Sequence, residues 1–377
     1  MAGVLEGLRI VEFAGVGPGP FCGMMLADHG AEVIRIDRKG AGFQVPHTIL
    51  SRGRRTITVD LKQPEGIEFV RRLCVQADGL IEGYRPGVME RLGLGPEVLL
   101  ARNERLIYGR ITGWGQDGPL AHRAGHDINY LAIAGALHTV GRHGERPVPP
   151  VNYVADFGGG GMLLAFGMVS ALLGVSRGGK GQIVDAAMVD GTALMLAMNL
   201  GLMAAGMWRD DRGCNLIDGG AHFYDTYETS DGKYIAIGPV EPQFYGELLD
   251  KLDLANDPDL TNQMDPSAWN AGRLKLAAVF KTKSREYWED LFSGSDACLS
   301  PVLSMTEAAT HPHNLARGTY LDIDGQIQPE VAPRFSRTPG CRQAISCDRI
   351  SDQNSIAIEA GYSQVDIDSL RKSGVVS

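Results

Sequence analysis

The sequence predicts an α/β protein, with a large domain built on a doubly wound parallel sheet and a second, smaller α+β domain. Three observations support this prediction. The chain opens with a strand, a glycine turn, a helix and a second strand. Its 377 residues exceed what one hydrophobic core usually supports. Near Gly219 the pattern changes from alternating strands and helices to a hairpin followed by helices.

The opening unit covers residues 8–37. Residues 8–14 are typical of a buried strand, the Gly- and Pro-rich segment 15–20 of a turn, residues 21–29 of a short apolar helix and residues 32–37 of a second strand. The alternation continues with helices at 65–75 and 161–173 and strands at 79–82, 105–111 and 182–186. An apolar helix is expected over 188–208, and its five methionines most simply pack in a core.

The smaller domain begins with two alternating segments around Asp231-Gly232, which is a hairpin signal. Amphipathic helices are expected at 242–252, 273–280 and 284–292, with a strand at 299–303. The C-terminal tail reads as ordinary globular sequence with a helix capped by Ser363.

Composition excludes several classes of protein. The chain is 44% hydrophobic and 21% charged, as in soluble globular proteins, and its net charge of −9 argues against nucleic-acid binding. The six cysteines form no C-x-x-C pair, so we expect them reduced and the protein cytoplasmic. We see no export signal and no run of about 18 apolar residues, so no membrane segment is expected.

Basic side chains are concentrated in residues 35–62. Seven Lys or Arg stand there against Asp37 and Asp60, which suggests either a local anion site, such as one for a nucleotide phosphate, or a solvated loop. The nearby turn at Gly15–Pro20 invites comparison with a dinucleotide fingerprint, but Pro20 stands in place of the third glycine. Arg38 beside Asp37 fits an adenine nucleotide with an extra phosphate better than NAD, so a nicotinamide dehydrogenase is the weakest alternative.

His126 and Asp156 are the imidazole and the carboxylate whose neighbouring residues most favour a role in a functional site. His126 begins a helix expected over 127–136, and Asp156 precedes a run of four glycines. Each also has a structural interpretation, as a hydrogen-bonded histidine and as a helix N-cap. Asp156-Phe157-Gly158 lacks the partner motifs of a kinase, so that interpretation fails. An imidazole and a carboxylate that face one carbon acid can remove a proton on one side and return it on the other.

Two further acids belong to this set. Asp127 lies at a helix start, where unpaired N–H groups can stabilise an oxyanion. Glu241 follows a strand of the smaller domain, where an acid usually starts a helix but can also orient an imidazole.

An ordered series of segments resembles the class III CoA-transferase family, and within it the members that epimerise 2-methylacyl-CoA thioesters. The series includes Ile-Glu-Gly-Tyr-Arg-Pro-Gly (81–87), Gly-His-Asp-Ile-Asn-Tyr (125–130), Asp-Phe-Gly-Gly-Gly (156–160) and Glu-Pro-Gln-Phe-Tyr (241–245). The segments 90–96, 112–116, 179–185 and 224–227 extend it over nearly the whole chain. Each fragment is weak alone, but the order and spacing are specific.

The resemblance implies a Rossmann-like large domain over residues 1–190 completed by 331–377, a linker helix region over 191–222 and a small domain over 223–330. It also implies an interlocked homodimer whose active site is shared between chains. His126 and Asp156 would be the proton-transfer pair, with Glu241 of the second chain orienting the histidine. The positions implied to hold coenzyme A are Arg38, Val59, Asp60, Leu61, Lys62, Tyr84, Arg85, Arg91, Gly125 and Tyr130.

The implied reaction interconverts (R)- and (S)-2-methylacyl-CoA by 1,1-proton transfer through an enolate, stabilised by N–H donors near Asp127. No metal or bound cofactor is expected, because coenzyme A enters with the substrate. Two alternatives stay open: a CoA transferase with Asp156 as nucleophile, and a CoA-binding protein without catalysis. His222 replaces a proline common in relatives, and we expect it at the surface.

Overall fold

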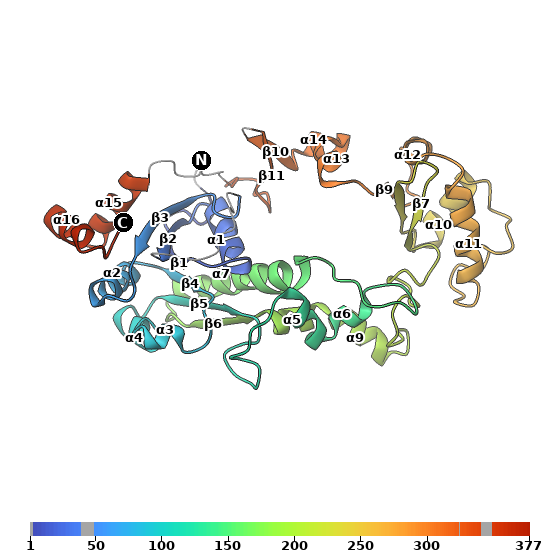
Figure 1. The fold of residues 1–377 in the computed structure, drawn as a ribbon. Helices are drawn as coiled ribbons and strands as arrows, with labels where there is room; N and C mark the ends of the chain where they lie inside the picture. Colours follow the sequence, from blue (N-terminus) through green and yellow to red (C-terminus); the bar gives the residue numbers. More distant parts are fainter. Residues whose placement is uncertain (1–2, 39–48, 324, 341–348) are drawn as a thin grey trace. The chain divides into compact units, whose positions relative to one another are not determined.

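The computed structural model describes residues 3–38, 49–323, 325–340 and 349–377 (Figure 1). The chain forms two compact units. Unit 1 comprises Met1–Ala134, Val151–Met195 and Gln328–Ser377, and unit 2 comprises Gly135–Pro150 and Leu196–Ile327. Lys39, part of the basic segment, lies outside the described residues.

Unit 1 is organised around a six-stranded sheet in the order β3-β2-β1-β4-β5-β6. All five pairings are parallel. This is the strand order of the Rossmann fold, with its topological switch between β1 and β4. The strands are β1 (Arg9–Phe13), β2 (Glu32–Arg38), β3 (Arg54–Val59), β4 (Gly79–Glu82), β5 (Ile107–Thr112) and β6 (Ile183–Ala187).

Helices cover both faces of this sheet (Figure 1). Alternating strand residues explain why, because Val11 and Phe13 enter one apolar cluster and Ile10 the other. One face carries α1 (Pro18–Asp28) and α7 (Leu163–Ser176). The other carries α2 (Pro64–Val75), α4 (Pro96–Arg102), α15 (Arg349–Glu359) and α16 (Gln364–Lys372), with the short α3 (Val88–Arg91) between β4 and α4.

The C-terminal tail returns to edge strand β3, which the sequence analysis had not assigned as a strand. Val376 bridges Val59 in antiparallel orientation, and the Asp60 N–H donates to the Val375 carbonyl at 2.8 Å. The tail thus satisfies backbone groups of an exposed edge and fixes the start of the β3–α2 loop.

Most of the basic segment holds the sheet together. Arg54 pairs with Glu12 in the interior, Arg52 pairs with Asp28, and Arg55 pairs with Glu32 and Glu359. These acidic partners all lie outside residues 35–62, so the charge of that segment alone does not reveal them. Arg35 pairs with Asp37, so Arg38 and Lys62 are the described members of the segment with exposed side chains.

Unit 2 has its own core around an antiparallel sheet of β7 (Asp225–Glu228), β8 (Tyr234–Ile237) and β9 (Leu299–Pro301). Gly232, at φ 73°, makes the hairpin turn that the sequence predicted. Phe223, Trp269, Phe280 and Trp288 form the aromatic centre of the core. The helices α10 (Pro242–Lys251), α11 (Trp269–Phe280) and α12 (Arg285–Phe292) pack into this core. The other helices of this part of the chain are α6 (Ala136–Thr139), α9 (Ala197–Ala204), α13 (Met305–Thr310) and α14 (Pro312–Arg317), and β10 (Tyr320–Ile323) pairs with β11 (Gln326–Pro329).

Three predictions about the apolar middle and His222 were wrong. The single helix over 188–208 is two helices, α8 (Met188–Met195) and α9. Its methionines do not all pack in a core, since Met188 is buried but Met198 and Met207 are 58% and 71% exposed. His222 is not at the surface but fully buried, with Nε2 2.7 Å from the Tyr245 hydroxyl.

The continuous helical segment Tyr153–Ser176 is, among the described residues, the one helix long and apolar enough to cross a membrane. Its residues Leu164 and Met168 pack into the sheet. The core helix of a folded domain has the same length and composition, so this feature is weak support for a membrane span.

Candidate active site

The predicted site residues of unit 1 follow the carboxyl ends of successive parallel strands. The Gly15–Pro20 segment, whose last three residues begin α1, follows β1, and Arg38 ends β2. Val59 ends β3 and residues 60–62 follow it, Tyr84 and Arg85 follow β4, and the 125–130 segment follows β5. Ligands of open α/β sheets bind at this edge. The topology therefore gathers at one edge residues as far apart in the chain as Gly15 and Tyr130.

The Asp127 side chain joins the two segments that carry His126 and Asp156. It is buried at the start of α5 (Asp127–Ala134), and its Oδ2 accepts the backbone N–H groups of Ala155 at 2.9 Å and Asp156 at 2.8 Å. Its Oδ1 is buried with no hydrogen-bond partner among the described residues. The sequence predicted a role only for backbone N–H groups near Asp127. The hydrogen bonds by which its side chain links the two segments were therefore not predicted.

Asp156 lies in the first turn of a π-helix, η1 (Tyr153–Met162), which continues into α7. It is therefore not the N-cap that its structural interpretation required, because Asn152 holds that place. The glycine run allows close packing: a Cβ on Gly159 would lie 2.8 Å from the backbone of Thr192, and one on Gly161 2.8 Å from Pro18 and Phe21. π-Helical turns of this kind are frequent at functional sites.

Burial raises the pKa of the half-buried Asp156 carboxyl, and the nearby Asp127 charge raises it further. The Asn152 amide, which donates to Oδ2 at 3.3 Å, and the His126 imidazole act in the opposite direction. The carboxyl group also faces Gly17, where an added Cβ would lie 3.6 Å from Oδ2. Asn152 was not singled out from the sequence, although it stands four residues before Asp156 at the N-cap of the same helix. Gly17 was considered only as part of the Gly15–Pro20 turn, not as a neighbour of Asp156.

His126 has an exposed side chain and a firmly held backbone. Its N–H donates to Asn129 Oδ1 at 3.0 Å, and its carbonyl accepts the Asn129 N–H at 2.8 Å. The Tyr130 hydroxyl donates to the Gly125 carbonyl, and its ring stands edge-on to Trp114 at 4.8 Å. Tyr130 is thus part of the scaffold of the loop, and the imidazole projects from a fixed position.

The other predicted ligand-binding positions differ in their surroundings. Arg38 lies over the Tyr84 ring at 5.5 Å, and Tyr84 Oη is buried with no partner among the described residues. Val59 and Leu61 are buried, whereas the Asp60 carboxylate accepts the Lys62 N–H at 3.0 Å and the Gln63 amide. Lys62, Arg85 and Arg91 have exposed side chains.

Glu241 belongs to unit 2, where its backbone forms the N-cap of α10. The side chain is exposed and makes no capping hydrogen bond. This agrees with a helix-start position, as expected, and leaves the carboxylate available to another group.

The fold and the site define a class. The chain belongs to CoA-transferase family III, whose model matches residues 5–345. Within it, the chain is 45% identical to the mouse protein "Alpha-methylacyl-CoA racemase", covering 99% of this chain and 97% of that protein. It is 47% identical to the human protein of the same name over 89% of this chain and 87% of that one.

A more distant relative and a solved structure are also similar to this chain. The human "Succinyl-CoA:glutarate CoA-transferase" is 29% identical, covering 88% of this chain and 80% of that protein. The crystal structure of a CAIB/BAIF family protein from Brucella suis superposes with a TM-score of 0.79 at 28% identity, covering 96% of this chain and all of that one. The family thus includes proteins named as racemases and as transferases.

Proposed function

We propose that this protein is an α-methylacyl-CoA racemase that interconverts (R)- and (S)-2-methylacyl-CoA thioesters. The observation that carries the proposal is the Asp127 carboxylate, which ties the Asp156 helix to the loop of His126. The two groups therefore keep a fixed relation to each other, as proton transfer on two sides of one carbon requires. The high identity to proteins named as racemases supports the same activity.

In the proposed reaction, His126 removes the α-proton from one face of the thioester. The electron pair of the C–H bond moves into the carbonyl and forms an enolate. The Asp127 N–H, the first of α5, has no intrahelical acceptor and can donate to the enolate oxygen. Asp156 then delivers its proton to the opposite face, and the reverse reaction exchanges the two roles. A raised Asp156 pKa helps this group act as an acid nearer neutral pH.

The coenzyme A part of the substrate would lie along the carboxyl edge of the sheet. Arg38, Lys62, Arg85 and Arg91 supply positive charge for its phosphates, and the buried Tyr84 hydroxyl offers an unused hydrogen-bonding group. We propose that no metal or resident cofactor takes part, because the thioester itself acidifies the α-carbon.

We further propose that the active enzyme is a homodimer and that Glu241 of a second copy orients His126. The exposed Glu241 side chain is consistent with this role. Met162, Phe166, Val169 and Leu173 form an exposed apolar stripe on one side of the Tyr153–Ser176 helix, which a second chain would cover. Sedimentation of the purified chain tests the dimer directly.

The reaction is tested by incubating the purified protein with (R)-2-methylacyl-CoA in heavy water. We expect epimerisation with one deuterium at the α-carbon and no need for an acceptor acid. Turnover that depends strictly on an added carboxylic acid would instead indicate a CoA transferase. The absence of both reactions, with retained CoA binding, would support a non-catalytic protein.

A further inference from the structure

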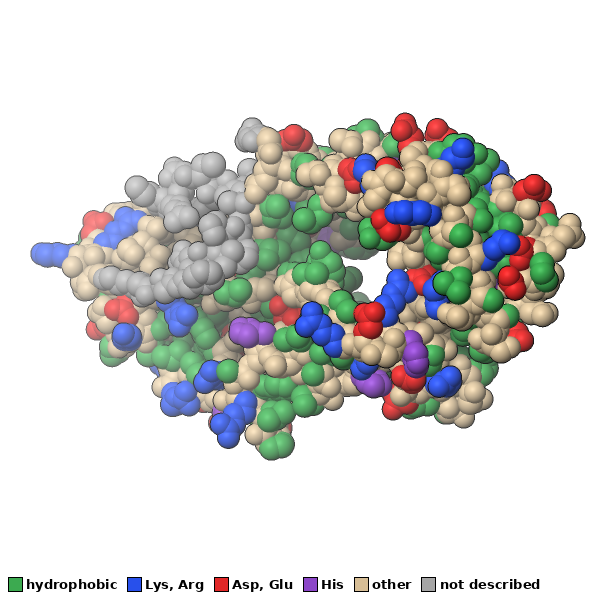
Figure 2. Space-filling model, turned by 45° about the vertical axis from the view of Figure 1, so that its right-hand side comes forward, with side chains coloured by type: hydrophobic (Ala, Val, Ile, Leu, Met, Phe, Trp, Pro, Cys, Tyr) green, Lys and Arg blue, Asp and Glu red, His purple; other side chains and the backbone are tan. Residues whose placement is uncertain are grey.

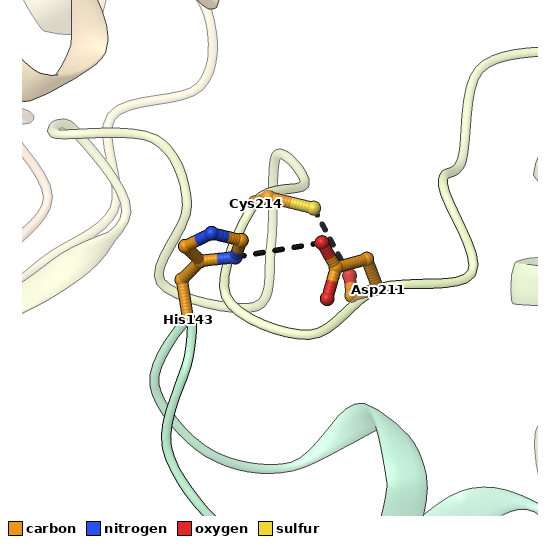
Figure 3. A group of neighbouring side chains, drawn as sticks. All are labelled: His143, Asp211 and Cys214. Atoms are coloured by element: carbon orange, nitrogen blue, oxygen red, sulfur yellow. Dashed lines mark hydrogen bonds and ion pairs between the residues drawn. The ribbon is translucent and has the colours of Figure 1, made fainter.

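Three side chains of metal-binding type converge in unit 2, in a cluster that the proposed racemase activity does not use. They are His143, Asp211 and Cys214 (Figure 3). Their potential ligand atoms all lie within 4.8 Å of one another, and His143 Nδ1 is 3.5 Å from Asp211 Oδ2. Figure 3 shows the imidazole nitrogen directed toward the Asp211 carboxylate and the Cys214 sulfur toward the Asp211 backbone carbonyl, to which the thiol donates at 3.0 Å.

The loop that carries Asp211 and Cys214 is held in shape by hydrogen bonds. The buried Asn215 amide donates to the carbonyls of Arg209 and Asp211, at 3.1 and 2.9 Å. Asp218 accepts the backbone N–H groups of Gly213 and Asn215, at 2.9 and 2.8 Å. Two of the three candidate ligands are therefore presented by a preorganised backbone.

The His143 segment is fastened to the same loop. The Arg212 guanidinium donates to the carbonyls of His138 at 3.0 Å and Glu145 at 2.9 Å, on either side of His143. Gly213, at φ 66°, lets the loops approach, since a Cβ there would lie 2.4 Å from the backbone nitrogen of His143. The cluster thus joins segments about 70 residues apart in the chain without requiring backbone rearrangement.

We propose that His143, Asp211 and Cys214 form a three-ligand binding site for Zn²⁺ or a chemically similar divalent cation. The mixed nitrogen, oxygen and sulfur donors match the ligands that Zn²⁺ prefers. Tetrahedral zinc needs donor atoms about 3.3 to 3.8 Å apart, so side-chain rotations alone can close the site. The Cys214 thiol gives its proton to solvent as sulfur binds the ion, and water fills the fourth position.

Occupancy would also affect a neighbouring pocket of unit 2. Gly141 and Arg142, directly before His143, line this pocket together with Asp218 and Gly219. A cation that links the two loops would therefore stiffen one of its walls. Ligand exchange at the fourth position gives the site a means to respond to small thiols or carboxylates.

The test is a Co²⁺ titration of the full-length protein, because a cobalt–thiolate bond gives a charge-transfer absorption band that carboxylate or imidazole sites lack. We expect one band-forming ion per chain, displaced by Zn²⁺. Cys214→Ser should abolish the band, and His143→Ala should weaken binding by at least about tenfold, since even second-shell changes cost 10- to 100-fold. Cys298→Ser, which changes another solvent-accessible cysteine of unit 2, is the matched control.

Absence of a thiolate band in the wild-type protein would overturn the proposal, as would a band that survives in Cys214→Ser or disappears in Cys298→Ser. Thermal unfolding without metal establishes that each variant is folded. If one is not, Cys214→Ala replaces Cys214→Ser and His143→Gln replaces His143→Ala. Because the readout is metal binding, its outcome is independent of whether the protein racemises thioesters.

Discussion

Charged side chains have different partners in the interior of the unit 1 sheet and at its carboxyl edge. In the interior, Arg54 donates to Glu12 through Nε and Nη2, and both side chains are almost completely buried. At the edge, the half-buried Asp156 accepts a hydrogen bond from the Asn152 amide and lies near the like charge of Asp127. Removing one partner of the buried pair would leave an uncompensated charge in the interior, whereas the raised pKa of the Asp156 carboxyl suits a group that exchanges a proton.

Asp156→Asn gives the largest expected effect on the edge side of this comparison. The amide cannot exchange a proton, so racemisation should fall about 10²- to 10⁴-fold. Because the native pKa of Asp156 is raised above 3.8, its ionised form is disfavoured in the fold and reduces stability as pH rises through that pKa. The Asn variant should therefore unfold at equal or higher urea concentration at pH 7. Loss of both activity and stability would contradict the comparison.

Arg54→Met tests the interior side. It leaves Glu12 buried without its cation, so the free energy of unfolding should fall by about 3 to 5 kcal/mol in urea denaturation. Glu12→Gln combined with Arg54→Met should recover part of the loss. A single variant as stable as the wild type would show that the pair does not hold the sheet.

Comparison of Ala and Asn variants of Asp127 separates the effect of its hydrogen bonds on the position of Asp156 from the effect of its charge on the pKa of Asp156. Asp127→Ala removes the two hydrogen bonds that link the segments of His126 and Asp156, and it should lower kcat about 10- to 100-fold. Asp127→Asn keeps an oxygen acceptor but removes the charge that raises the Asp156 pKa. In the direction of racemisation in which Asp156 acts as the base, the acid limb of the pH–rate profile of Asp127→Asn should therefore shift to lower pH. Identical behaviour of the two variants would exclude a separate positioning role, because both remove the charge and only Ala also removes the acceptor. An acid limb in Asp127→Asn unchanged from the wild type would exclude the electrostatic role.

His222 extends the comparison to the interior of unit 2. Burial, with a smaller contribution from Arg273, lowers its pKa from 6.5 to about 4. Below pH 6.5, the His222 imidazole binds a proton in the unfolded chain but stays neutral in the native state. The free energy of unfolding should therefore fall by roughly 1–3 kcal/mol from pH 6.5 to 4. His222→Gln should flatten this dependence in urea melts at several pH values, and an unchanged slope would assign it to other groups.

Arg38→Gln is the mildest change, because the side chain is exposed at the edge. We expect about tenfold weaker coenzyme A binding by calorimetry, equivalent to about 1.4 kcal/mol. The free energy of unfolding should change by less than about 0.5 kcal/mol. A larger loss of stability would place Arg38 with the structural arginines.

The sequence predicted the fold class correctly because strand alternation and glycine turns are local signals. The strand at Arg54–Val59 was missed because its arginines resemble a solvated loop, and their acidic partners lie as far away as Glu359. In the same way, His222 was expected at the surface because the neighbouring sequence does not indicate its hydrogen bond with the Tyr245 hydroxyl.

By itself, the sequence determined the order of elements and the imidazole and carboxylates available at strand ends, since both follow from neighbours along the chain. Only the tertiary structure decided which charges are neutralised and which remain reactive. Hydrogen bonds such as those from Ala155 and Asp156 to Asp127 join residues 28 and 29 positions apart. Burial and pairing depend on distance in space, which sequence spacing does not encode.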